Sequence, residues 1–169
     1  TNKVDRPMQS TMSAFGNQGR STMKSMMIVA VTVAAVAAGA VLADGTPSPQ
    51  GARVYFVNLE DGATVTSPVK VIFGLSGMGV APAGTESEGS GHHHILVDRP
   101  PLGEGEAGEE ELASSLPSDD NHFHFGGGQT EVMLDLERGT HSLQLVLGDK
   151  NHVPHNPPVM SNRIMITVE

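Results

Sequence analysis

Two short segments of the chain bring histidines together in strand-like sequence. The first is GHHHILVD, residues 91–98, and the second is NHFHFGGGQ, residues 121–129. Imidazole nitrogens are ligands that suit zinc, copper and nickel, so the five rings in these segments could build a metal site. The alternative interpretation is that they are ordinary strand residues on a solvated face.

Side chains alternate between the two faces of a strand, which predicts where each imidazole of the first segment points. Ile95 and Val97 share one face, and we expect that face to lie against the core. His92 and His94 then point outward together. His93 lies on the core side, where we expect it at the mouth of the strand or in a structural hydrogen bond.

The second segment repeats this pattern. Phe123 and Phe125 favour the core, so His122 and His124 point outward together. Residues i and i+2 of a strand lie roughly 6.5–7 Å apart, and cross-strand β-carbons lie about 5 Å apart. If the two segments are adjacent strands, their outward imidazoles surround one point. The connection, residues 99–120, permits this pairing without proving it.

Imidazoles without thiolates favour copper(II), zinc or nickel, and copper(II) binds most tightly in that divalent series. We therefore predict a copper site, with zinc as the alternative. The predicted ligands are His92, His94, His122, His124 and His152.

The remaining histidines lie nearer the C-terminus. His152 and His155 belong to the loop KNHVPHNPP, residues 150–158. His152 could supply a second arm of the site or a weak surface chelate, and His155 is the weaker candidate. His141 alternates with the leucines of residues 143–147, which predicts a histidine at the edge of the core with a backbone partner.

Three consecutive glycines, residues 126–128, follow directly on Phe125. Glycine reaches backbone conformations closed to other residues, so one interpretation is a bend in the strand. The other is a surface where a ligand or partner approaches the backbone.

Composition narrows the possible functions. The chain has no cysteine, which excludes disulfides, thiolate metal sites and cysteine nucleophiles. Residues 44–169 carry 6 basic and 18 acidic side chains, a net charge of −12. Such a domain repels nucleic acid and anionic membranes and attracts cations.

The N-terminal part has the form of a secretory signal peptide. Lys24 precedes the apolar run of residues 26–43, which ends in the cleavage-like triplet VLA. We expect residues 1–22 to be a non-native or unstructured extension, residues 23–43 to be the signal peptide and residues 44–51 to be a flexible leader. An uncleaved membrane anchor is the alternative. Export predicts a location in the bacterial periplasm.

Residues 52–169 predict an all-β domain. About seven short runs with period-two alternation, separated by Gly, Pro, Asn and Asp, are typical of an immunoglobulin-like antiparallel β-sandwich. The predicted strand residues are 53–57, 69–75, 95–97, 123–125, 132–136, 143–147 and 164–168.

Two long loops interrupt these strands, residues 77–91 and 99–120. The second is rich in Asp and Glu, and residues 106–115 could form a short helix. It is either a solvated loop that aids solubility or an electrostatic funnel for cations beside the histidines.

Recognisable catalytic motifs are missing. The sequence GLSGM, residues 74–78, has methionine where a nucleophile elbow needs its second glycine, and no HExxH occurs. We therefore favour a protein without catalytic activity, and an enzyme stays the less favoured alternative.

Four segments carry a resemblance to a known family: GHHHILVD, HFHFGGGQTE, RGTHSLQLVLGDKNHVPH and SNRIMITVE. Over about residues 52–169 the chain resembles a bacterial exported domain family of unknown function, numbered four-three-nine-nine. The resemblance implies export and the extent of the domain. The family has no established activity, so no residue roles follow from it.

A weaker resemblance is to copper–zinc superoxide dismutase, a β-sandwich in which a His-x-His strand binds copper. His122-Phe123-His124 followed by glycine is similar to that strand, but the cysteine pair and a convincing zinc loop are missing. Bacterial copper carriers with immunoglobulin-like sandwiches are a second architectural likeness.

Three functions are therefore expected, in decreasing order. The first is a periplasmic domain that binds copper, or zinc, as a carrier, buffer or accessory module. The second is a metal-free interaction module with a protein partner in the envelope. The third is a copper redox enzyme of the superoxide dismutase type.

Overall fold

The computed structural model describes residues 45–105 and 108–169. The predicted extension and signal peptide, residues 1–43, lie outside the described residues. Within the described residues, no helix has both the length and the apolar character needed to cross a membrane.

The described residues form β-strands and one short helix. In chain order, these elements are β1 (Arg53–Phe56), β2 (Ala63–Val65), β3 (Val69–Ser76), β4 (Gly79–Val80), β5 (Ser90–Val97), α1 (Gly108–Ala113), β6 (His122–His124), β7 (Glu131–Leu134), β8 (Gly139–Gly148) and β9 (Ile164–Val168). The all-β prediction is confirmed, and the predicted helix within residues 106–115 is confirmed as α1.

The strands form two sheets. The smaller sheet has the order β1-β3-β7, and the larger has the order β2-β9-β8-β5-β4, with β6 paired to β5 outside this path. β2 pairs with β9 in parallel, and β4 pairs with β5 in parallel. The expectation of purely antiparallel sheets is therefore wrong for these two pairs. Both involve strands of two or three residues, too short to show an alternating pattern in the sequence.

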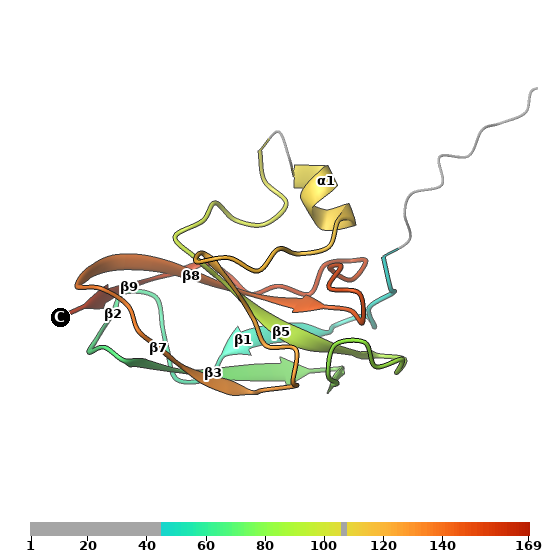
Figure 1. The fold of residues 1–169 in the computed structure, drawn as a ribbon, viewed down its shortest axis with the longest axis horizontal. Helices are drawn as coiled ribbons and strands as arrows, with labels where there is room; N and C mark the ends of the chain where they lie inside the picture. The colour runs from blue at the N-terminus through green and yellow to red at the C-terminus, as the bar shows by residue number, and fades with distance from the viewer. Residues whose placement is uncertain (1–44, 106–107) are drawn as a thin grey trace, which may run out of the picture. The chain divides into compact units, whose positions relative to one another are not determined.

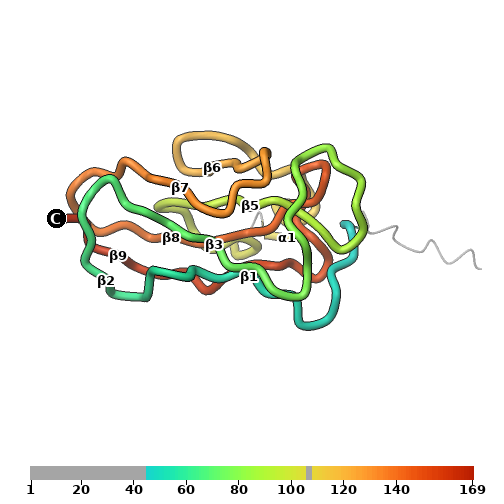
Figure 2. Tube along the Cα trace, turned by 90° about the horizontal axis from the view of Figure 1, so that it is seen from below, coloured from blue at the N-terminus to red at the C-terminus, as the bar shows by residue number. Residues whose placement is uncertain are grey.

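A single apolar core lies between the two sheets. Alternate residues of each strand face it, as the period-two pattern predicts. From the larger sheet come Ile95, Val97, Leu143, Leu145, Leu147 and Ile166, and from the smaller come Val54, Val71, Phe73 and Leu134. The two layers are seen edge-on in Figure 1, and in Figure 2 the strands β1, β3 and β7 lie over β9, β8 and β5.

The other face of the larger sheet is also covered. Leu96 of β5 and Val146 of β8 pack against Leu102, Leu112 and Leu116 in a second, smaller apolar cluster. These three leucines belong to the acidic connection and to α1, which lies over this sheet on the side away from β3 (Figure 1). Strands β5 and β8 are consequently buried on both faces.

Candidate metal centre

The two histidine segments are neighbouring strands. β5 and β6 pair in an antiparallel arrangement, with His94 opposite His124, Ile95 opposite Phe123 and Leu96 opposite His122. The side chain of Ile95 faces the core between the sheets. The outward imidazoles of both strands consequently share the opposite face of the larger sheet, as the alternation predicts.

This face is buried rather than solvated. The side chains of His92, His94 and His122 are all 0% exposed. The connection that carries α1 packs its leucines on Leu96 and Val146 of this sheet. It is fastened to the loop around His152, because the Leu116 amide donates to the His152 carbonyl at 2.8 Å. The alternative of a solvated histidine face is therefore wrong, because the leucines of the acidic connection cover the sheet.

Three of the imidazoles converge. His92, His94 and His124 each offer a ring nitrogen, and these nitrogens all lie within 4.8 Å of one another. Nε2 of His92 lies 3.0 Å from Nε2 of His94. Two nitrogens bound to one ion at about 2.0–2.1 Å lie roughly 2.9–3.4 Å apart, from right-angle to tetrahedral geometry. The triad could therefore hold a metal ion after small side-chain movements.

The polar atoms of these rings lack the partners that buried groups normally have. Among the described residues, buried ring nitrogens without a hydrogen-bond partner are Nδ1 of His92 and His94 and Nε2 of His93, His122 and His124. More than nine in ten buried polar groups are usually paired, and an unpaired one costs about 1–3 kcal/mol. An ion held by the triad would satisfy Nε2 of His124, whereas His92 and His94 face each other through Nε2 and keep Nδ1 unpaired.

The environment keeps the triad in the neutral form that binds metals. Burial, with the neighbouring imidazoles, lowers the pKa of His94 to about 2 and that of His92 to about 4. Burial and then His152 lower the pKa of His124. At neutral pH no proton has to be displaced from an imidazolium before these rings coordinate an ion.

His152 approaches the triad from a different segment. Its ring centroid lies 4.6 Å from that of His124, 5.0 Å from that of His92 and 6.1 Å from that of His94. Its backbone has φ of +67°, a conformation that is uncommon for a residue with a side chain and is enriched at functional sites. The structure therefore brings this predicted residue to the site, on the loop that follows β8.

The loop that carries His152 is held by Asp149. This buried carboxylate accepts hydrogen bonds from the amides of Asn151 and Val153 at 2.8 and 3.0 Å. The Thr46 hydroxyl donates to it at 2.6 Å. These hydrogen bonds hold the pKa of Asp149 below its usual value although burial alone would raise it. A fixed negative charge therefore lies beside the candidate ligands.

Two glycines leave space for the rings. A β-carbon on Gly126 would collide with Cε1 and Nε2 of His124, and one on Gly148 would lie 2.8 Å from Nε2 of His94. The first corresponds to the glycine run that was interpreted either as a bend or as a ligand-facing surface. Gly148 lies beside His94 because β8 pairs with β5. The sequence gives no sign of this pairing.

His122 lies at the other end of the cluster. Its ring centroid is 5.2 Å from that of His94, but it is not one of the three residues whose nitrogens converge. The pairing places it opposite Leu96, two residues beyond His94, so it cannot meet His92 across the strands. Its Nδ1 lies 3.0 Å from a guanidinium nitrogen of Arg99.

The remaining histidines have structural partners. Nδ1 of His93 lies 3.2 Å from the Gln129 carbonyl, which confirms the structural hydrogen bond expected for this ring. His141 contacts the Glu137 carbonyl through Nε2 at 2.9 Å, as expected, and also the Asp98 carboxylate through Nδ1 at 2.7 Å. His155 is buried, with ring nitrogens near the carbonyls of Leu147 and Ser90.

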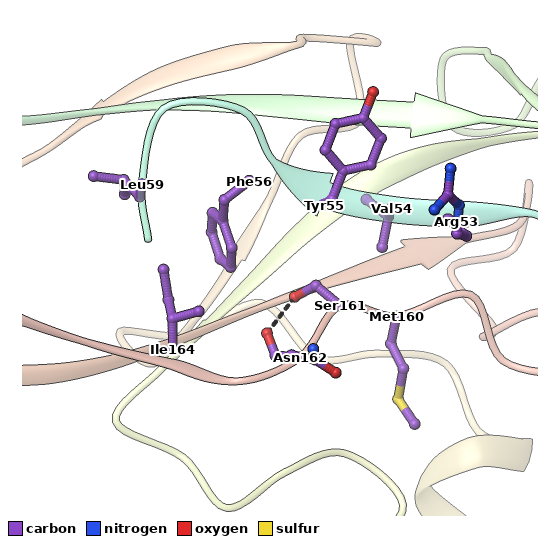
Figure 3. Close-up of a pocket in the computed structure, with 9 residues that line it drawn as sticks. All are labelled: Arg53, Val54, Tyr55, Phe56, Leu59, Met160, Ser161, Asn162 and Ile164. Carbon is purple, nitrogen blue, oxygen red and sulfur yellow. Dashed lines mark hydrogen bonds between the residues drawn. The ribbon is translucent and has the colours of Figure 1, made fainter. Parts of the chain in front are cut away.

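A separate hollow of about 440 Å³ lies between β1 and the segment that leads into β9. Tyr55, Phe56, Met160 and Ile164 line it, as Figure 3 shows, and no histidine does. Its only charged lining residue is Arg53. The hollow lacks the converging polar groups that give a small-molecule site its specificity.

The fold and the site define an all-β domain with a buried histidine cluster that could hold a metal ion. The chain belongs to the family described as Domain of unknown function (DUF4399), whose model matches residues 71–169. This confirms the family resemblance, and the matched part begins within β3 rather than at residue 52. Searches of curated proteins and of solved structures found no match to this chain.

Proposed function

We propose that this chain is a periplasmic metal-binding protein with an immunoglobulin-like sandwich, and that it binds copper, or less favourably zinc. His92, His94 and His124 are the central ligands and His152 is the fourth. The protein acts as a carrier, buffer or accessory module for the metal. The observation that carries this proposal is the 3.0 Å approach of the His92 and His94 Nε2 atoms beside His124.

The donor set favours copper over other metals. Neutral imidazoles without thiolate or carboxylate suit copper(II), nickel and zinc, and copper(II) has the highest intrinsic affinity of these. The Asp149 carboxylate lies near His92 without belonging to this donor set, and its negative charge favours a cation there. The acidic composition of residues 44–169 supports the same preference.

The decisive experiment is elemental analysis of residues 44–169, exported without a histidine tag and purified without chelating resin. Near-stoichiometric copper or zinc is expected, and it should be lost in the double variant His94→Ala/His124→Ala. A matched control is His141→Ala, which removes an imidazole bonded to Asp98 and Glu137, outside the cluster. If the wild-type protein holds neither metal after exposure to copper(II) and desalting, the proposal fails.

A metal-free interaction module in the envelope is the second candidate. The observation that favours it is the hollow of Figure 3, where the side chains of Tyr55 and Met160 are 44% and 39% exposed. Partner capture by the wild-type protein that is lost in Tyr55→Ser, with no metal in either protein, would support this candidate over metal binding.

A further inference from the structure

Arg99 connects the histidine cluster to helix α1. One of its guanidinium nitrogens lies 3.0 Å from Nδ1 of His122, and another donates to Oε1 of Glu111 at 2.9 Å. Oε2 of Glu111 accepts a hydrogen bond from the amide of Gly103 at 3.3 Å. The guanidinium is consequently fixed between the helix and one imidazole.

This contact determines the tautomer of His122. A guanidinium group has only donors and does not lose its proton in proteins, so Nδ1 of His122 must be the acceptor. The proton of the neutral ring then lies on Nε2. Neither nitrogen offers a free lone pair: one is engaged by Arg99 and the other is protonated. A buried ring fixed in this form cannot coordinate an ion unless Arg99 is displaced.

Charge separates the two ends of the cluster. Arg99 places a positive charge beside His122, with a guanidinium nitrogen 3.0 Å from Nδ1 of that ring. At the other end, Asp149 places a negative charge near His92. A cation entering the cluster is therefore repelled from the His122 end and attracted to the end nearest Asp149 and His152.

We infer that Arg99 determines the ligand set by excluding His122 and confining the ion to His92, His94, His124 and His152. Arg99 is thus a specificity-determining residue that acts through a second side chain. The sequence suggests a symmetric ligand set of two His-x-His pairs. With His122 excluded, the ligand set is asymmetric, with two histidines from β5, one from β6 and His152. This inference rests on the proposed metal binding, but its tautomer component can be tested in the metal-free protein.

Copper(II) titration followed by electron paramagnetic resonance tests the ligand set. With Arg99 present, His122→Ala should leave the spectrum unchanged and the Kd within about threefold, whereas loss of a triad ligand such as His94 should cost about 100-fold or more, beyond the range for groups that only orient ligands. Arg99→Met should free His122, so that the spectrum changes and the Kd shifts by about tenfold. The double variant Arg99→Met/His122→Ala should regain the wild-type spectrum.

The control for removing a cation is Lys70→Met, because Lys70 pairs with Glu131 at the surface. His122→Gln provides a second test of the ligand set if His122→Ala does not fold. The inference is overturned if either His122 variant alters the copper spectrum as strongly as His94→Ala does. It is also overturned if Arg99→Met folds and leaves the spectrum unchanged.

Nitrogen NMR of the histidine rings in the metal-free protein separates this inference from the proposed function. His122 should show an unprotonated Nδ1 and a protonated Nε2, and Arg99→Met should abolish that preference. A protonated Nδ1 in the wild-type protein overturns the role of Arg99, whatever the metal content. A protein with the expected tautomer that binds neither copper nor zinc overturns the proposed function, and the ligand selection with it.

Discussion

Gly148 on β8 leaves the space that the imidazole of His94 occupies on β5. A β-carbon at Gly148 would lie 2.8 Å from Nε2 of His94, and this nitrogen is also the atom that faces His92 at 3.0 Å. Even the smallest side chain on β8 would therefore push this nitrogen away from its partner. The fold fixes the direction of a candidate ligand through a residue that has no side chain.

Gly148→Ala should accordingly weaken metal binding more than it weakens the fold. Displacing one of three convergent nitrogens by a few tenths of an ångström should raise the Kd for copper(II) about tenfold, within the range for residues that orient ligands. Competitive titration against a chelator of known affinity measures this change. Gly79→Ala is the matched control, because its β-carbon would lie 3.8 Å from its nearest contact, Ser90. Equal affinity for wild type and Gly148→Ala would show that His94 Nε2 is not a ligand atom.

The directions of the histidines could be predicted from the sequence because alternation is a local property. In GHHHILV, the apolar pair Ile95 and Val97 fixes one face, and the structure places both in the core. The same reasoning correctly orients Phe125. The pairing of the two histidine strands could not be predicted in the same way. The length of the connection allows it, but contacts between residues so far apart in the sequence leave no periodic signal.

Burial of the cluster could not be predicted for a related reason. The cover comes from Leu102, Leu112 and Leu116, which stand singly among acidic and small residues and resemble a solvated loop. The register is equally hidden: it places His124 opposite His94 but His122 opposite Leu96. A set of four converging rings on β5 and β6 was therefore a reasonable interpretation of the sequence, whereas the structure gathers three of them and brings in His152.

His152→Ala should weaken copper binding without abolishing it. The triad of His92, His94 and His124 remains, so we expect a loss of about 10- to 100-fold and one nitrogen fewer in the copper coordination sphere. His124→Ala, which removes a triad member, should cost more. Isothermal titration gives the affinities and X-ray absorption counts the nitrogen neighbours. An unchanged nitrogen count would remove His152 from the ligand set.

The metal-free protein should lose stability as the pH falls below the ordinary pKa of histidine. Burial lowers the pKa of His93 to about 4, opposed by its bond to Gln129, and the pKa values of His92 and His94 are lowered as well. Between pH about 6.5 and about 4 the unfolded chain therefore binds protons that the folded chain does not, and unfolding becomes easier as pH decreases. Urea denaturation across this range measures the effect.

His93→Leu should make that pH dependence shallower, because one buried titrating ring is removed from a site beside Phe73. Its stability at neutral pH should decrease by about 1 kcal/mol through loss of the hydrogen bond to the Gln129 carbonyl. Val57→Leu, at an exposed position, is the control for an added apolar side chain. A wild-type free energy of unfolding that stays constant from pH about 7 to about 5 would contradict the assignment of these rings as buried and neutral.

His141 should show the opposite dependence on pH. Its pKa is raised, first by the bond to the Asp98 carboxylate and also by the Glu137 carbonyl. The stabilisation from the charged ring is therefore fully present below pH about 6.5 and is lost as the pH rises through the folded pKa. His141→Gln should reduce the free energy of unfolding more at pH about 5.5 than at about 9.

Asp98→Asn provides the complementary test, because it keeps the shape of the side chain that bonds Ser142 and His141 but removes its charge. It should lower the NMR-measured pKa of His141 and reproduce the same pH window of lost stability. If His141 instead titrates below its ordinary value, the ring is governed by desolvation, as the cluster histidines are, rather than by its carboxylate. The two classes of histidine in this chain would then not be separable by pH, and the acid sensitivity could no longer be assigned to the buried histidines of β5.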